Sequence, residues 1–76
     1  MKIPNIQRGV IVRRMLLSIV RLCHQRGQPL PRHDAIGAVI GIDDSQVSRH
    51  LSRLRAEGAF AVSRAGRRFY IQEIRP

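Results

Sequence analysis

The glycine at position 41 is the residue that most constrains this chain, because it separates two helical patterns within one short stretch of sequence. The first pattern covers residues 33–40, only about two helical turns, and carries Asp34 in its first turn, where a carboxylate complements the helix dipole. Its residues expected to face inward are Ile36, Val39 and Ile40. Because glycine accepts the positive φ of a tight turn, we predict that one helix stops at Gly41 and another starts just after it.

The second pattern predicts a helix whose start is marked by a capping sequence. Asp43 is a preferred N-cap residue, and Gln46 follows at the spacing of a capping box. Apolar residues at intervals of four and three predict one buried stripe: Val47, Leu51 and Leu54. Gly37, in the preceding helix, permits the two helices to approach closely. Residues 33–57 are therefore expected to form a helix-turn-helix.

A longer amphipathic helix is expected ahead of this pair, over about residues 8–26. Its apolar stripe consists of Val12, Leu16, Ile19 and Cys23. Gly27 ends the helical pattern, and Pro29 and Pro31 prevent the helix from resuming. The connection of residues 27–31 should therefore be extended.

The last part of the chain predicts a β-hairpin over about residues 59–74. The expected strands are residues 59–64 and 67–73, with the tip at Ala65 and Gly66. Phe69 and Ile71 are expected to join Phe60 and Val62 over the helices. The predicted fold class is α+β, mainly α, with three helices followed by a two-stranded antiparallel hairpin, in a single domain of residues 1–76.

The charge of the chain indicates a polyanionic partner. Fourteen Lys and Arg residues against five Asp and Glu residues give a formal net charge of +9, and Lys2 is the only lysine. Arginine grips a phosphate or a guanine edge with two parallel hydrogen bonds, whereas lysine offers a point charge. This composition favours nucleic acid over an acidic protein, although a basic bias of the genome is an alternative that only the positions of the arginines can decide.

The segment from Gly37 to Leu51 reads GAVIGIDDSQVSRHL, and it resembles the winged helix-turn-helix regulators of bacteria. The arsenic-repressor and multiple-antibiotic-resistance-regulator kinds have recognition helices similar to residues 43–51, with VSRHL nearly verbatim. The chain also resembles the DNA-binding domain of the SOS repressor, through the LPRHDAIG segment and the basic hairpin, although we do not expect that family's second domain within these 76 residues. The resemblance is best over residues 33–74.

This resemblance implies a set of DNA-binding residues in the second helix of the pair and in the hairpin, or wing. The residues implied to face the major groove are Asp44, Ser45, Ser48 and Arg49, with Gln46, Ser52 and Arg53 at the flank. Those implied to contact the backbone or the minor groove are Arg64, Arg67 and Arg68. Arg49 is the expected reader of guanine, and Arg53 is expected on a phosphate. Asp44 either accepts from cytosine or complements the helix dipole.

The expected function is that of a sequence-specific regulator of transcription that binds double-stranded DNA. A winged-helix module that binds RNA or a protein, or that binds DNA without reading its sequence, is the alternative. The direction of regulation and the operator stay open. A homodimer is expected from apolar residues beyond the needs of one small core: Ile3, Ile6, Val10, Ile11, Val12 and Ile74.

The remaining residues indicate no catalysis. The acidic residues are few and scattered, so we expect no enzyme activity, and nothing indicates a cofactor or a small-molecule effector. Four potential metal ligands lack a motif spacing, and we expect no metal site: Cys23, His24, His33 and His50. Without an apolar stretch of membrane-spanning length, a cytoplasmic, nucleoid-associated location is expected.

Overall fold

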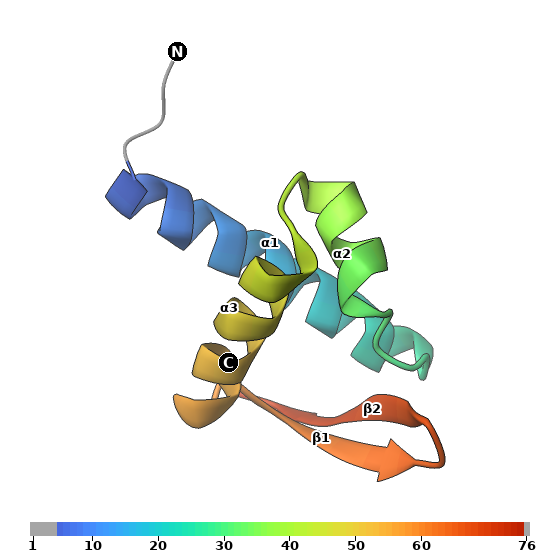
Figure 1. Cartoon of the computed structure of the whole chain (residues 1–76). Helices are drawn as coiled ribbons and strands as arrows, with labels where there is room; N and C mark the ends of the chain where they lie inside the picture. Colours follow the sequence, from blue (N-terminus) through green and yellow to red (C-terminus); the bar gives the residue numbers. More distant parts are fainter. Residues whose placement is uncertain (1–4, 76) are drawn as a thin grey trace.

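The helices come first in the chain and a hairpin comes last (Figure 1). The computed structural model describes the backbone of residues 5–75 and the side chains of residues 8–75. The helices are α1 (Asn5–Arg26), α2 (His33–Ile40) and α3 (Asp44–Ala56), and the antiparallel strands are β1 (Phe60–Ala65) and β2 (Arg68–Ile74). The predicted fold class is confirmed: the domain is α+β, mainly helical, with the layout of a winged helix. Within the described residues, no helix has the length and apolar content needed to cross a membrane.

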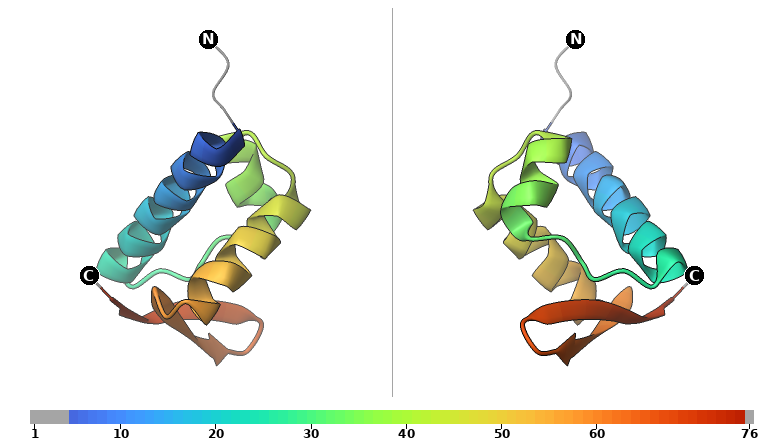
Figure 2. Two further views of the ribbon diagram at one scale, coloured as in Figure 1. Left: turned by 90° about the vertical axis from the view of Figure 1, so that its left-hand side faces the viewer. Right: turned by 90° about the vertical axis from the view of Figure 1, so that its right-hand side faces the viewer.

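The core lies between α1, α3 and the hairpin, which spans the carboxyl ends of both helices (Figure 2). Its buried residues are Val12, Leu16, Val20, Cys23, Ile36, Val47, Leu51, Leu54, Phe60 and Ile71. The predicted stripes of α1 and α3 are therefore confirmed, except that Ile19 is only half-buried and Val20 is fully buried in its place. The core is aliphatic apart from Phe60 and Cys23.

The turn between α2 and α3 depends on Gly41 and Gly37. Gly41 has φ +80°, and the N–H groups of Gly41 and Ile42 both donate to the Gly37 carbonyl, at 2.8 and 3.0 Å. A methyl group on Gly37 would overlap the carbonyl oxygen of Ile42. The positive φ predicted for Gly41 is confirmed. Gly37 is needed for a close approach, as predicted, but the approach is to the turn backbone at Ile42 and not to the second helix.

One predicted inward residue of α2 is wrong. Val39 is 78% exposed, whereas Ile36 and Gly37 are buried and Ile40 is half-buried. The buried face of this two-turn helix runs through Gly37, which presses against the Ile42 carbonyl, so the face is centred between positions 36, 37 and 40. At 100° per residue, Val39 falls about 110° from that centre and points to solvent.

The hairpin is displaced by one residue from its predicted position. Ala65 pairs with Arg68, so that the two-residue loop is Gly66 and Arg67. Gly66 has φ +65°, and a loop of two residues that needs a positive φ at its first position selects glycine there. The hydrogen-bonded pair at the tip therefore forms one residue later than expected.

A β-bulge in β2 was not predicted. Ala61 pairs with Glu73 and Val62 pairs with Ile71, so Gln72 is the extra residue. Residues three apart on a regular strand lie on opposite faces, but the bulge lets both Ile71 and Ile74 pack toward the core.

Phe69 does not join the core as predicted, and it lies next to the hairpin loop, as the second residue of β2. The Phe69 side chain is 44% exposed, although its backbone carbonyl accepts from the Leu30 N–H at 2.7 Å. Pro29 also forms an isolated antiparallel bridge with Tyr70. The extended connection between α1 and α2 therefore lies along the open edge of β2, a pairing that the sequence did not indicate.

The close approach at Gly37 can be tested with a pair of alanine substitutions. We expect Gly37→Ala to lower the free energy of unfolding by about 1–3 kcal/mol, because the new methyl group overlaps backbone that cannot move aside. Gly9→Ala, in α1 where an added Cβ meets no atom within 4 Å, should instead raise it by roughly 0.5–1 kcal/mol. Urea unfolding followed by circular dichroism measures both, and equal effects would contradict the role of Gly37.

Candidate nucleic-acid interface

The outer face of α3 carries the exposed residues that lie opposite its buried stripe. Ser45, Arg49 and Ser52 recur at intervals of four and three, and all three are exposed. Ser48, one of the residues implied to face the major groove, is half-buried on the side of α3 that faces the hairpin, where it lines a small hollow with Ser52 and Phe69. The outermost face of α3 is thus small and polar around a single guanidinium.

The start of α3 is held by its predicted cap. The Asp43 carboxylate accepts from the Gln46 N–H at 2.8 Å and from the Ser45 hydroxyl at 2.6 Å. Both hydrogen bonds hold the pKa of Asp43 below its ordinary value, and the bond from the Ser45 hydroxyl has the larger effect. Because the Ser45 hydrogen is used within the protein, Ser45 meets an outside partner mainly as an acceptor.

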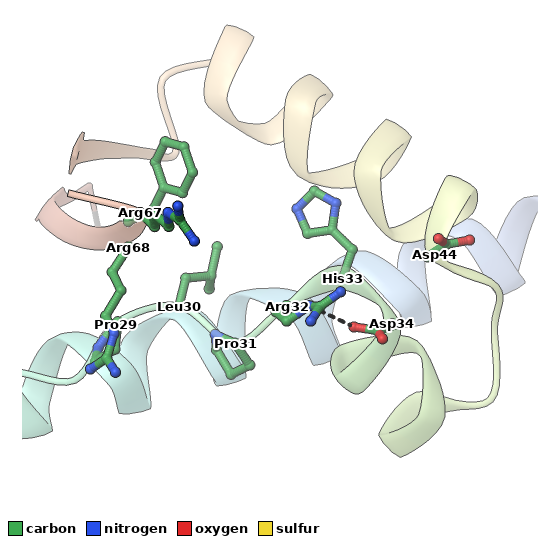
Figure 3. Close-up of a pocket in the computed structure, with 10 residues that line it drawn as sticks. Pro29, Leu30, Pro31, Arg32, His33, Asp34, Asp44, Arg67 and Arg68 are labelled. Atoms are coloured by element: carbon green, nitrogen blue, oxygen red, sulfur yellow. Dashed lines mark ion pairs between the residues drawn. The ribbon is translucent and has the colours of Figure 1, made fainter. Parts of the chain in front are cut away.

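A groove of about 670 Å³ lies between the hairpin and the starts of α2 and α3 (Figure 3). Three residues implied by the resemblance line it: Asp44 from α3, Arg67 from the hairpin loop and Arg68 from the start of β2. Pro29, Leu30, Pro31 and Phe69 give it an apolar lining. The fold thus brings residues from the second helix of the pair and from the wing to one concave surface.

Two further basic residues of this groove were not predicted from the sequence. Arg32 and His33 line it from the start of α2. The Arg32 guanidinium lies 3.6 Å from the Asp34 carboxylate, and both side chains are largely exposed, so this ion pair contributes little to stability and leaves Arg32 free to exchange partners. Their only sequence signal is a basic pair beside Pro31; their place in the groove depends on the pairing of residues 29–30 with β2.

Two of the implied residues lie on the opposite flank of α3, away from this groove. Gln46 lines a hollow with Arg8 and His50, next to α1. The Arg53 Nε donates to Glu57 at 3.2 Å, one helical turn further on, and both side chains are exposed. These two residues therefore flank the outer face of α3 without joining the groove.

The wing arginines differ in how they are held. Arg64 Nε donates to the Gly66 carbonyl at 2.9 Å, and its guanidinium lies 5.9 Å from the centre of the Phe69 ring. A cation over an aromatic ring is attracted to it, so Arg64 folds back along the hairpin. Arg67 and Arg68 instead line the groove.

The histidine and cysteine side chains give no grouping suited to a metal. Within the described residues, no three His, Cys, Asp or Glu side chains come together. Cys23 is buried in the core, where burial raises the pKa of its thiol and the nearby Arg26 opposes that effect. His50 is half-buried, and its pKa lies below the ordinary value, first because of burial and then because of Arg13, Arg49 and Arg53.

No family model, curated protein or solved structure matches the chain. The function is therefore inferred from the outer face of α3, from the groove beside the start of α3, and from the elements that position their residues.

The half-buried His50 predicts a pH dependence of stability. Its folded pKa is below the ordinary value of 6.5, so the unfolded chain binds the proton more readily than the folded protein does. The stability that depends on a neutral His50 is fully present above about pH 6.5, and it is lost as the pH falls through the folded pKa. We expect urea midpoints measured from pH 7 to pH 5 to fall less steeply in His50→Gln. His24→Gln, on an exposed site of α1, is the matched control, and a slope that changes equally in both variants refutes the assignment.

Proposed function

We propose that this protein is a regulator of transcription that binds double-stranded DNA sequence-specifically, with α3 in the major groove and the hairpin on the adjacent backbone or minor groove. The observation that carries the proposal is the position of Arg49. It stands exposed on the outer face of α3, and the start of the same helix, at Asp44, lines a groove that gathers arginines from the hairpin and from the start of α2. The resemblance to bacterial winged helix-turn-helix regulators supports the same reading.

The dimensions of α3 suit this role. A helix of 13 residues is about 20 Å long and, with side chains, about 10–12 Å across, which the major groove of B-DNA accommodates. The Arg49 guanidinium can donate two hydrogen bonds to one guanine edge. Ser45 and Ser52 extend only short polar side chains on either side of it, so the helix can approach the bases closely.

The groove beside α3 suits the phosphate backbone. Arg32, Arg67 and Arg68 supply guanidinium groups from two separate places in the chain, against the carboxylates of Asp34 and Asp44. Deoxyribose presents an apolar edge between phosphates, and Leu30 and Phe69 offer it an apolar surface. The net charge of +9 adds a long-range attraction to any such duplex.

We also propose that the protein acts as a homodimer, since one α3 reads only about half of a two-fold operator. Two of the residues that motivated this expectation belong to the core instead: Val12 is buried, and Ile74 packs against the core. Val10 is 40% exposed and Ile11 is half-buried, while the Ile3 and Ile6 side chains lie outside the described residues. The remaining apolar surface of this group lies near the start of α1.

The roles of the arginines can be separated by their sequence and salt dependence. A preferred site is first selected from a random duplex pool. We expect Arg49→Ala to weaken binding to that site by about 1–3 kcal/mol, roughly 5- to 150-fold in Kd, and to weaken binding to unrelated duplexes much less. Arg68→Ala should weaken all duplexes alike and lower the slope of log K against log salt by about 0.9.

Arg21→Ala, which removes one exposed charge from α1, is the matched control for both substitutions. If Arg49→Ala lowers affinity uniformly and no sequence is enriched from the pool, the protein binds DNA without reading it. Tighter binding to single- or double-stranded RNA than to any duplex DNA would favour the RNA-binding alternative.

Dimerisation is measured by sedimentation equilibrium, without DNA and with the selected site. We expect a concentration-dependent dimer, two copies on each site, and a selected sequence with two-fold symmetry. A monomer at high micromolar concentration, together with a site that lacks symmetry and binds one copy, would remove this part of the proposal.

A further inference from the structure

We propose that the outer side of α1 binds an acidic amphipathic helix of a partner protein. The surface consists of Ile11, Met15, Ser18 and Leu22, which we name the α1 stripe. It is independent of the residues proposed to contact DNA, so this inference goes beyond the proposed function.

The α1 stripe has the spacing of a helix-pairing seam. Its residues follow at intervals of four, three and four, which keeps them in one line along a helix. Met15 is 44% exposed and Leu22 is 46% exposed, and Ile11 is half-buried. The Ser18 hydroxyl donates to the Arg14 carbonyl at 3.0 Å, so its hydrogen is already bonded within α1. A partner helix therefore meets a mostly apolar line without an unsatisfied donor.

A shallow hollow beside the amino-terminal half of the stripe offers a place for a partner side chain. It is lined by Ile11 and Met15 of α1 and by Ile40 and Ile42 around the turn after α2, and its volume is about 160 Å³. This volume suits one apolar side chain of a helix lying along α1. Helix-in-groove recognition uses apolar anchors of this kind at helical spacing.

The charges around the stripe determine which helix it fits. The chain contains no Asp or Glu before Asp34, so α1 is free of acidic side chains. Exposed arginines lie three or four positions from stripe residues, which makes them neighbours of the stripe on the helix surface: Arg8, Arg14, Arg21 and Arg26. An apolar seam bordered by cations on both sides is complementary to an apolar seam bordered by carboxylates.

The same charges disfavour two other occupants. A second copy of α1 laid along the stripe would bring arginines against arginines in either orientation, since α1 contains no acidic residue. The homodimer proposed above is therefore expected to pair through a surface other than the stripe. A lipid surface requires a broad apolar face, whereas the stripe is about one residue wide and has arginine on each side. An acidic amphipathic helix is complementary both to the apolar stripe and to the arginines on either side of it.

The test uses a fluorescein-labelled designed peptide of three heptads, with Leu at positions a and d and Glu at positions e and g. Fluorescence anisotropy with the full chain should show saturable binding that weakens as salt rises. Met15→Ser combined with Leu22→Ser leaves the net charge unchanged and should raise the Kd of the peptide at least tenfold. Val10→Ser combined with Val39→Ser, which removes two exposed apolar side chains off the stripe, should leave it within about twofold.

A scrambled peptide of the same composition and a peptide with Lys in place of Glu complete the experiment. Equal binding of the scrambled peptide, or no effect of the paired serine substitutions, overturns the proposal, because general attraction to a basic chain then explains the result. Self-association lost on the same serine substitutions assigns the stripe to a second copy. Binding to anionic phosphatidylserine vesicles that depends on Met15 and Leu22, without binding of the acidic peptide, assigns it to a membrane. Both of these results also overturn the proposal, and neither bears on binding of duplex DNA.

Discussion

The approach of α2 to the turn that follows it is the contact on which the geometry of this domain depends. Gly37 lies against the Ile42 carbonyl, and its own carbonyl accepts both N–H groups of the turn. Asp43 caps α3 immediately afterwards, so the direction of α3 is fixed within two residues of that contact. The exposure of Arg49 is a consequence, because burying Val47, Leu51 and Leu54 from this starting point turns the opposite side of α3 outward.

Local signals predicted the helices well where a chain-breaking residue and an apolar period agreed. The bounds of α2 and the cap of α3 follow from Gly41 and Asp43, which act on their own neighbours. The hairpin was less predictable, since a period of two contains no sign of an extra residue such as Gln72. The prediction for Val39 was wrong because two turns of helix offer too few residues to define a buried face. The contact of Gly37 with the Ile42 carbonyl turns that face away from Val39.

The candidate site was predictable one element at a time, but its assembly was not. The helical period predicts that most of the polar residues of α3 lie opposite its buried stripe, and of these only Ser48 is half-buried: Ser45, Ser48, Arg49, Ser52 and Arg53. By contrast, Arg32 and His33 enter the groove because residues 29–30 pair with β2, about 40 positions later in the chain. Long-range pairing of this kind has no signature in a short window of sequence. The resemblance named Gln46 and Arg53, which the fold places on the other flank of α3, and their contact with DNA stays a prediction.

The distribution of charge links the stability of the domain to the binding of any polyanion. Among the described residues, ten buried apolar side chains form a thin core, while the formal charge of +9 favours expansion of the chain. Among residues 8–75, two ion pairs offset this repulsion, and both are exposed. Most arginines on the groove face and along α1 therefore lack an ion-pair partner among these residues. A polyanion that binds only the folded arrangement of these groups relieves the repulsion and adds its binding free energy to that of folding. The same excess of arginine that weakens the isolated domain thus favours its folded state whenever an anionic surface of matching shape is bound.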